Sequence, residues 1–324
     1  MATSGIEIPV IDIDRDPQVV GSEIDETLRS VGFFQITNHG VEQGVSERCW
    51  QLTRAFFDLP LDDKAAIQRE GSSPYGYFPM LSESLNQSMD GIGPGDLKES
   101  LNAPATPYDG HAFADDVERD LFASPRWPDA LPGLEAAWTA YMQEMWTLAE
   151  RLMSIFALGL GLPSGYFADK IDRSPTSLRA INYPEQAAPP EAGQLRAGAH
   201  TDYGTLTILR QELGRAGLQV HDGKTDAWVD VAPVAGAYVI NIGDLMARWT
   251  NDRWASTLHR VVNPDAGSTV STRRQSMPFF FNANYSQVVE CLPTCLGVEG
   301  ARYAPVLAGP HLTGKFEKST ANTM

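Results

Sequence analysis

The residues with the clearest chemical potential are a histidine and an aspartate separated by one position, in the triplet His200-Thr201-Asp202. Of the six histidines in the chain, His200 alone is followed two positions later by a carboxylate. The surrounding run at 199–209, AHTDYGTLTIL, becomes strongly apolar, which predicts a strand. Side chains two positions apart on a strand share a face, so these two can converge on one metal ion.

A third metal ligand is predicted at His259, which lies in the β-prone segment 257–262. Two histidines and one carboxylate on one side of a metal are typical of non-haem iron(II) oxygenases. This set leaves three coordination positions for a bidentate 2-oxo acid and O₂. A lone histidine in a strand is commonly a core residue, so the assignment of His259 depends on the His-x-Asp triplet.

A second group of residues, Arg274-Gln275-Ser276, suits a carboxylate. Arg274 and Ser276 share a strand face by the same two-residue period, and a guanidinium offers a planar fork that matches a carboxylate. The apolar run that follows, MPFFF at 277–281, would form dry walls that strengthen such an ion pair. Arg273 faces the other way and is predicted to form a surface ion pair.

These side chains require strands to position them, and the second half of the chain is rich in strand patterns. Short β-prone segments separated by Gly and Pro are typical of a sandwich or barrel. They are predicted at 199–209, 217–220, 227–231, 237–242, 257–262 and 275–282.

The first half of the chain is predicted to be mostly helical, after β-prone segments at 6–13 and 31–36. Apolar residues follow helical spacing from Val45 to Phe56, and again along a long core helix from Leu134 to Ile155. The fold class is therefore mixed α+β, with a helical N-terminal half packed against an all-β C-terminal half.

Composition limits the classes of partner. The formal net charge of −16 disfavours binding to phosphate backbones and anionic membrane surfaces, so neither nucleic acid nor membrane is expected. No apolar stretch is long enough to span a bilayer, and no secretory signal is recognised at the N-terminus. Three cysteines cannot all pair within one chain, which favours a reducing compartment. We therefore predict a cytoplasmic protein with a small-molecule substrate; the oligomeric state is left open, and a monomer is compatible.

With these residues in place, the chain resembles the isopenicillin N synthase-like family of iron(II)/2-oxoglutarate-dependent dioxygenases. The resemblance extends from IPVID at 8–12 to about residue 292. The family's motifs follow in their usual order, each modest alone but specific together: GFFQITNHGV at 32–41, LRAINYP at 178–184, the His-x-Asp triplet, NIGD at 241–244, HRV at 259–261 and Arg-x-Ser at 274–276.

The resemblance implies a fold and a role for individual residues. The core would be a double-stranded β-helix, or jelly roll, with His200, Asp202 and His259 as iron(II) ligands. The co-substrate 2-oxoglutarate would be held by Arg274, Ser276 and Tyr183. His39 would be a structural turn residue, and Asp244 would brace the fold beside the site.

The same resemblance implies a division of the chain into four parts. An N-terminal dioxygenase region would occupy 1–120, with a variable loop near 84–120. A long core helix and connector would follow at 121–170, then the jelly-roll core at 171–292 and a C-terminal tail at 293–324.

The implied reaction uses iron(II), O₂ and 2-oxoglutarate to hydroxylate or desaturate a small molecule, with release of succinate and CO₂. The substrate is predicted to be a mid-sized, partly apolar compound, such as a specialised metabolite. Its predicted surroundings are Tyr75, Tyr77, the glycine-rich loop to Gly95, and Phe281.

Two alternatives stay open. In co-substrate-free oxidases such as isopenicillin N synthase and aminocyclopropane carboxylate oxidase, the Arg-x-Ser pair serves another carboxylate. The synthase binds its peptide with an arginine four residues before a tyrosine. Here Gly71 and Ser73 occupy the positions four residues before Tyr75 and Tyr77. A catalytically silent or zinc-bearing jelly roll would use the same ligands, because zinc accepts them, but would have no use for the carboxylate clamp.

Overall fold

Strands from both halves of the chain form one eight-stranded sheet. The computed structural model describes residues 7–71, 73–85, 94–106, 110–186, 188–265 and 271–320. The order of the major sheet is β1 (Val10–Asp12), β2 (Phe33–Thr37), β10 (Tyr238–Ile242), β7 (Leu206–Gln211), β12 (Arg274–Phe281), β5 (Ser177–Tyr183), β4 (Glu99–Pro104) and β3 (Gly76–Phe78). Since β1 to β4 belong to the first half of the chain, the two halves share one core.

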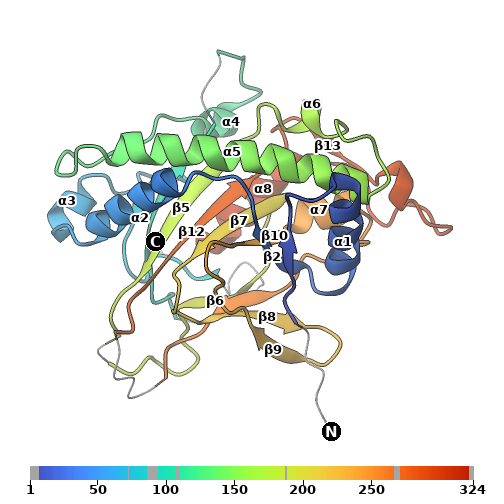
Figure 1. Ribbon diagram of the computed structural model, residues 1–324. Coiled ribbons are helices and arrows are strands. Elements are labelled where there is room, and N and C mark those ends of the chain that lie inside the picture. The colour runs from blue at the N-terminus through green and yellow to red at the C-terminus, as the bar shows by residue number, and fades with distance from the viewer. Residues whose placement is uncertain are drawn as a thin grey trace, which may run out of the picture.

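A smaller sheet faces the middle of the major sheet. Its order is β6 (Ala197–His200), β11 (His259–Val261), β8 (Leu218–Asp222) and β9 (Ala227–Asp230). In Figure 1 these strands lie below the major sheet, and the chain passes repeatedly between the two. Buried side chains from both sheets, such as Tyr183, Val220 and Val261, pack together between them. This is the predicted jelly-roll arrangement. A third sheet pairs β13 (Val288–Val289) with β14 (Val306–Leu307).

Helices cover the outer face of the major sheet, with α5 (Leu134–Gly159) running across it (Figure 1). Apolar residues at spacings of three and four give α5 a buried stripe, as predicted. Gly21 of α1 (Pro17–Ser30) permits close packing, because a Cβ added there would lie 2.8 Å from the Gly159 nitrogen. The other helices are α2 (Gln43–Phe57), α3 (Leu61–Ala65), α4 (Asp116–Leu121), α6 (Ala168–Ile171), α7 (Asp244–Trp249) and α8 (Ala308–Thr320), with a 3-10 turn at Pro293–Cys295.

One predicted strand, 199–209, is wrong as a single element. The chain leaves β6 after His200 and enters β7 at Leu206, with a turn between them. The start of α7 causes the break: the backbone N–H of Asp244 donates to the Asp202 carbonyl at 2.8 Å, and that of Leu245 donates to Gly204 at 3.1 Å. His200 and Asp202 therefore converge through a turn and not through strand alternation.

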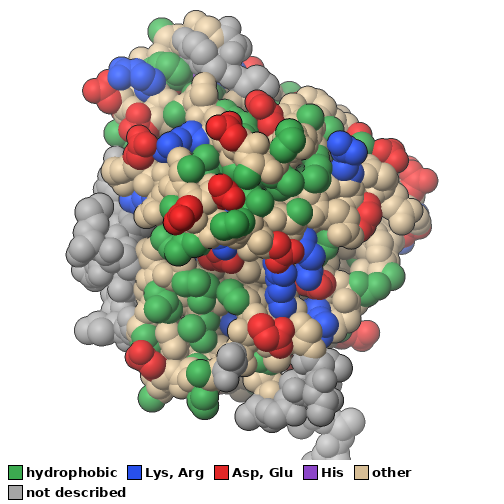
Figure 2. Space-filling model, turned by 90° about the vertical axis from the view of Figure 1, so that its left-hand side faces the viewer, with side chains coloured by type: hydrophobic (Ala, Val, Ile, Leu, Met, Phe, Trp, Pro, Cys, Tyr) green, Lys and Arg blue, Asp and Glu red, His purple; other side chains and the backbone are tan. Residues whose placement is uncertain are grey.

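The molecular surface mixes charges of both signs. On the face shown in Figure 2, basic side chains of the described residues are interspersed with acidic ones and with hydrophobic side chains. Ion pairs such as that between Arg54 and Glu212, at 2.7 Å, also bring opposite charges together. Among the described residues, none of the helices has the length and apolar character needed to cross a bilayer. All three cysteines are unpaired.

Candidate metal and carboxylate site

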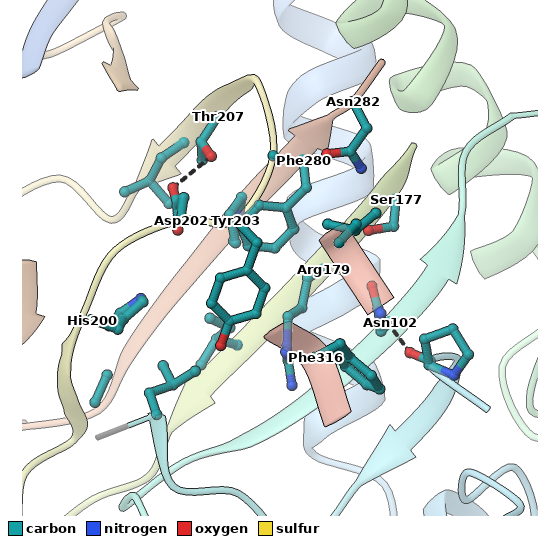
Figure 3. A pocket seen from close by; sticks show the side chains of 18 of the residues that line it. Asn102, Ser177, Arg179, His200, Asp202, Tyr203, Thr207, Phe280, Asn282 and Phe316 are labelled. Atoms are coloured by element: carbon teal, nitrogen blue, oxygen red, sulfur yellow. Dashed lines mark hydrogen bonds between the residues drawn. The ribbon is translucent and has the colours of Figure 1, made fainter. Parts of the chain in front are cut away.

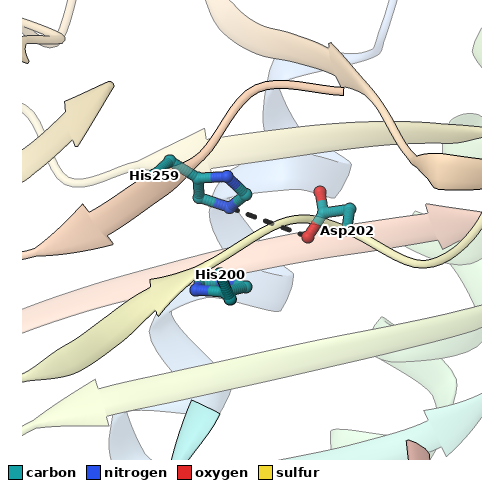
Figure 4. A group of neighbouring side chains, drawn as sticks. All are labelled: His200, Asp202 and His259. Atoms are coloured by element: carbon teal, nitrogen blue, oxygen red, sulfur yellow. Dashed lines mark ion pairs between the residues drawn. The ribbon is translucent and has the colours of Figure 1, made fainter. Parts of the chain in front are cut away.

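Three side chains converge at the junction of β6 and β11. His259 and His200 are register partners on these strands, and their ring centroids lie 4.2 Å apart. The Nε2 atom of His259 lies 3.7 Å from Oδ1 of Asp202 (Figure 4). One potential ligand atom from each of the three residues lies within 4.8 Å of the other two. A metal ion could therefore contact all three at once.

Backbone carbonyls orient both histidines. Nδ1 of His200 lies 2.8 Å from the Gly198 carbonyl, and Nδ1 of His259 lies 3.0 Å from the Thr257 carbonyl. A carbonyl can only accept, so each Nδ1 carries the proton and each Nε2 is left with a lone pair for a metal. Burial is the main cause, and the neighbouring His259 the second, of a pKa of His200 that lies well below its ordinary value. The ring is thus kept in the neutral form that binds metals.

Asp202 is held by two hydrogen bonds on one of its oxygens. Oδ2 accepts from Thr207 Oγ1 and from Asn241 Nδ2, both at 2.6 Å. Burial raises the pKa of Asp202, but the two histidines and these hydrogen bonds outweigh it, so the net shift is downward. The carboxylate is therefore ionised, with Oδ1 directed toward the histidines.

Loss of the Asn241 hydrogen bond should weaken metal binding. Partners of metal-ligating groups are typically worth 10- to 100-fold in affinity, so Asn241→Ala should weaken iron(II) binding by about that factor. Anaerobic iron(II) titration would measure this. Asn263→Ala is the matched control, because Asn263 is half-buried but lies outside the cavity lining. Equal affinities in the two variants would contradict the orienting role.

Arg274 presents a buried cation without a charge partner. Its side chain is 1% exposed, and Nη2 donates to Gln211 Oε1 at 3.3 Å. Nε and Nη1 have no hydrogen-bond partner, and among the described residues no carboxylate is paired with Arg274. The guanidinium lies 5.1 Å from the ring centroid of Tyr183, its register partner on β5. A buried guanidinium in this state calls for an anion, and a carboxylate fits its fork.

The metal-binding cluster and Arg274 line the same cavity, whose volume is about 260 Å³. Figure 3 shows the part of its lining around His200, Asp202 and Arg179. One wall is the inner face of β5 and β12, where every second side chain faces the cavity. Leu312, Thr313 and Phe316 of α8 also line the cavity. The wall residues from β5 and β12 are Ser177, Arg179, Ile181, Tyr183, Arg274, Ser276, Pro278 and Phe280.

Most of the predicted site residues line this one cavity. They are His200, Asp202, His259, Arg274, Ser276, Tyr183 and Tyr75. Arg273 points away, as predicted, and pairs with Asp58 at 2.5 Å. His39 lies in a turn, where its Nδ1 accepts from the Val41 N–H at 3.1 Å.

The structure places Tyr77 and Phe281 away from the cavity, which corrects their prediction as substrate neighbours. Tyr77 is buried in the core, where its hydroxyl donates to Glu99 at 2.5 Å. Phe281 packs edge-on against Trp146, with centroids 5.1 Å apart. Phe280 faces the cavity instead, because it shares the parity of Arg274 on β12. Residues 91–93 of the predicted glycine-rich loop lie outside the described residues.

Several cavity residues were missed as site residues. Arg179 and Asn241 lie within quoted motifs, and Thr207 could have been found by its position beside the His-x-Asp triplet. No sequence pattern pointed to α8. Its Lys315 pairs with Asp244 at 2.9 Å, and Asp244 accepts a hydrogen bond from Ser256 at 2.7 Å. Asp244 thus braces the site, as the resemblance implied.

Known proteins resemble this chain along most of its length. The family model described as non-haem dioxygenase in morphine synthesis N-terminal matches residues 8–130, and that of the 2OG-Fe(II) oxygenase superfamily matches residues 175–283. A 2-oxoglutarate-Fe(II) type oxidoreductase (hxnY) of Emericella nidulans is 33% identical over 304 residues, covering 92% of this chain and 84% of that protein. Validamycin A dioxygenase of Streptomyces hygroscopicus is 31% identical over 313 residues, covering 93% and 83%.

Solved structures share the fold. A full-length Neurospora crassa protein in complex with alpha-KG and 5-formyluracil aligns with a TM-score of 0.83 and 27% identity. The alignment covers 99% of this chain and 98% of that chain.

Proposed function

Because this chain belongs to the 2OG-Fe(II) oxygenase superfamily, we propose that it oxidises a small organic molecule with O₂ and 2-oxoglutarate, releasing succinate and CO₂. One observation supports this most directly. The three convergent side chains His200, Asp202 and His259 line the same cavity as the unpaired guanidinium of Arg274. A metal and a carboxylic acid can therefore be held in one cavity.

The donor set suits iron(II). Nε2 of His200, Nε2 of His259 and Oδ1 of Asp202 would hold the ion, and two histidines with one carboxylate are the set typical of such centres. When bound, iron(II) with O₂ and 2-oxoglutarate supplies the oxidising chemistry. The hydrogen bonds from the histidine Nδ1 atoms and to Asp202 Oδ2 keep these ligands in place without any contribution from the metal.

The far end of the cavity suits the distal carboxylate of 2-oxoglutarate. Arg274 would donate to it from its unpartnered nitrogens, and Ser276 lies two residues along the same face of β12. Tyr183 lies beside Arg274 on β5 and would also contact the co-substrate. Enclosure by apolar neighbours such as Leu209 and Val261 removes water and strengthens the charged contact.

The two alternatives receive less support. Two relatives that match more than nine-tenths of this chain are named as a 2-oxoglutarate-Fe(II) type oxidoreductase and as a dioxygenase. These names do not favour a co-substrate-free oxidase. A zinc-bearing or silent jelly roll would leave a buried arginine without an anion, which is costly.

Product analysis tests the proposed function. The iron-loaded protein would be incubated with 2-oxoglutarate and pools of candidate metabolites, while succinate and substrate masses are followed together. We expect the substrate to stimulate succinate formation. The mass of the substrate itself should rise by about 16 Da on hydroxylation or fall by about 2 Da on desaturation. The proposal would be refuted if the protein failed to bind 2-oxoglutarate and no metabolite pool stimulated the formation of succinate.

We further propose that the segment 293–324, predicted from the sequence as a C-terminal tail, helps to close the cavity through α8. Truncation after Leu307 would remove Leu312, Thr313 and Phe316 from the enclosure and break the pair between Lys315 and Asp244. The ratio of oxidised product to succinate should fall several-fold, because water would enter and the substrate would be held less well. Lys224→Ala in the full chain is the control, because Lys224 is exposed and lies outside the cavity lining. An unchanged ratio in the truncated protein would contradict the closing role.

A further inference from the structure

The cavity contains a second polar subsite that the metal and the co-substrate do not use. Asn102 of β4 and Arg179 of β5 are register partners on neighbouring strands, and both line the cavity. Side chains opposite one another in an antiparallel pair have Cβ atoms about 5 Å apart. Asn102 is 7% exposed and Arg179 is 9% exposed, so both are built into the wall and shielded from bulk solvent.

Asn102 lines the cavity and has one side-chain acceptor without a partner. Its Nδ2 donates to the Pro74 carbonyl at 2.6 Å (Figure 3). Because a carbonyl can only accept, this contact fixes the orientation of the side-chain amide. The remaining Oδ1 is buried and has no hydrogen-bond partner. A ligand at this position must therefore supply an N–H or O–H donor.

Arg179 lines the cavity, and its charge is already paired with a carboxylate. Its Nη2 is paired with Glu83 and donates to Ser100 Oγ at 2.8 Å. Nε is buried without a partner. The nearby ammonium of Lys98 is likewise paired, with Asp96 at 2.7 Å. A third cation near Glu83, Arg69, lies outside the cavity lining. Because Arg179 and Lys98, which do line the cavity, already have carboxylate partners, the subsite suits a neutral acceptor such as a carbonyl better than a second carboxylate.

This subsite is separate from the co-substrate end. Arg179 and Tyr183 are four residues apart on β5, which corresponds to about 13 Å along a strand. Tyr183 lies beside Arg274, so the two guanidinium groups serve opposite ends of the cavity. Figure 3 shows the aromatic side chains of Tyr203, Phe280 and Phe316 around Arg179. Flat aromatic walls suit a planar ligand.

We propose that this subsite binds the substrate through a neutral, planar amide-type group, such as a lactam or a ring carbonyl next to a ring N–H. The carbonyl accepts from Arg179, and the N–H donates to Oδ1 of Asn102. This inference names the substrate class for the proposed oxygenase and rests on that function. Both partners are needed, because an unpaired buried donor or acceptor carries the full cost of its desolvation.

Ligand-observed NMR on the full chain tests the subsite without turnover. The protein would be loaded with zinc(II), which takes the same ligand set but is redox-inactive, and with 2-oxoglutarate. The probes are 2-quinolone, its N-methyl derivative, which lacks the N–H, and 2-naphthoate, a carboxylate of similar size. We expect 2-quinolone to bind about tenfold or more tightly than either of the others. Equal binding of all three, or a preference for 2-naphthoate, would overturn the proposal.

Two variants identify the residues involved. Arg179→Lys keeps a charge for Glu83 but loses the planar donors, and Asn102→Ala removes the acceptor. Each should weaken 2-quinolone binding about tenfold, whereas Arg253→Lys should not, because Arg253 pairs with Asp25 and lies outside the cavity lining. Thermal melting checks that each variant is folded. The preference of the unmodified protein among the three probes tests the subsite even if a variant does not fold. Unchanged binding in both folded variants would place the probe elsewhere.

The iron(II)–2-oxoglutarate charge-transfer band, recorded on samples of the same protein loaded with iron(II) in place of zinc(II), reports the proposed function independently. A missing band with intact probe selectivity would refute the oxygenase and leave the subsite as a binding site. A normal band without probe selectivity would refute the subsite alone.

Discussion

Replacement of His200 by alanine should abolish the weak visible charge-transfer band that iron(II) and 2-oxoglutarate give when bound together. His200 supplies one of three convergent ligand atoms, and its Nε2 lone pair has no substitute among the neighbouring described side chains. Even an outer partner of a metal ligand is worth about 10- to 100-fold in affinity, so loss of the ligand itself should cost at least about a hundredfold. Substrate-dependent succinate formation should disappear with the band.

His221→Ala is the matched control for this experiment. His221 lies on β8 of the same small sheet but pairs with Asp226 at 3.0 Å, outside the cavity lining. Its loss should leave the band and the iron(II) affinity unchanged. If His200→Ala kept the band at its original iron(II) requirement, the metal would lie elsewhere and the ligand assignment would be wrong.

Replacement of Arg274 by alanine should raise the concentration of 2-oxoglutarate needed for half-maximal turnover. Truncating one partner of a buried, hydrogen-bonded charge pair costs about 2–5 kcal/mol, which corresponds to roughly thirtyfold to a few thousandfold. The 1% exposure of Arg274 argues for a large effect, because water cannot replace the lost donor. Initial rates of succinate formation over a range of 2-oxoglutarate concentrations would measure it.

Arg273→Ala separates this effect from a general loss of positive charge. Arg273 is the preceding residue, but it pairs with Asp58 on the other face of the strand. Its loss should leave the 2-oxoglutarate requirement within about twofold, because a partly exposed ion pair contributes little. A similar requirement in the two variants would show that the co-substrate carboxylate binds away from Arg274.

Local spacing predicted those parts of the site that depend on strand geometry. The two-residue period correctly placed Arg274 and Ser276 toward the cavity and Arg273 away from it, because alternation is a property of the extended backbone itself. By the same two-residue period, Phe280 faces the cavity and Phe281 faces away from it. The wrong prediction of Phe281 as a substrate neighbour could therefore have been avoided from the sequence. The helical stripe that predicted α5 is equally local.

Other features depend on contacts between distant segments. The turn after His200 exists because the N–H groups at the start of α7 bond to the Asp202 and Gly204 carbonyls. The subsite of Asn102 and Arg179 arises from the register of β4 against β5. Neither can be read from spacing, because register and docking are decided by which surfaces pack together.

The sequence by itself determined the chemistry available: a His-x-Asp triplet, a later histidine, an Arg-x-Ser pair, and the order of motifs that identified the family. Tertiary structure decided which of these side chains share a cavity, which nitrogen of each histidine is free, and which cations are already paired. The reason is that backbone periodicity acts within a few residues. Burial and charge pairing, by contrast, are set by neighbours such as α8, which lies more than a hundred residues from His200 in the chain but lines the same cavity.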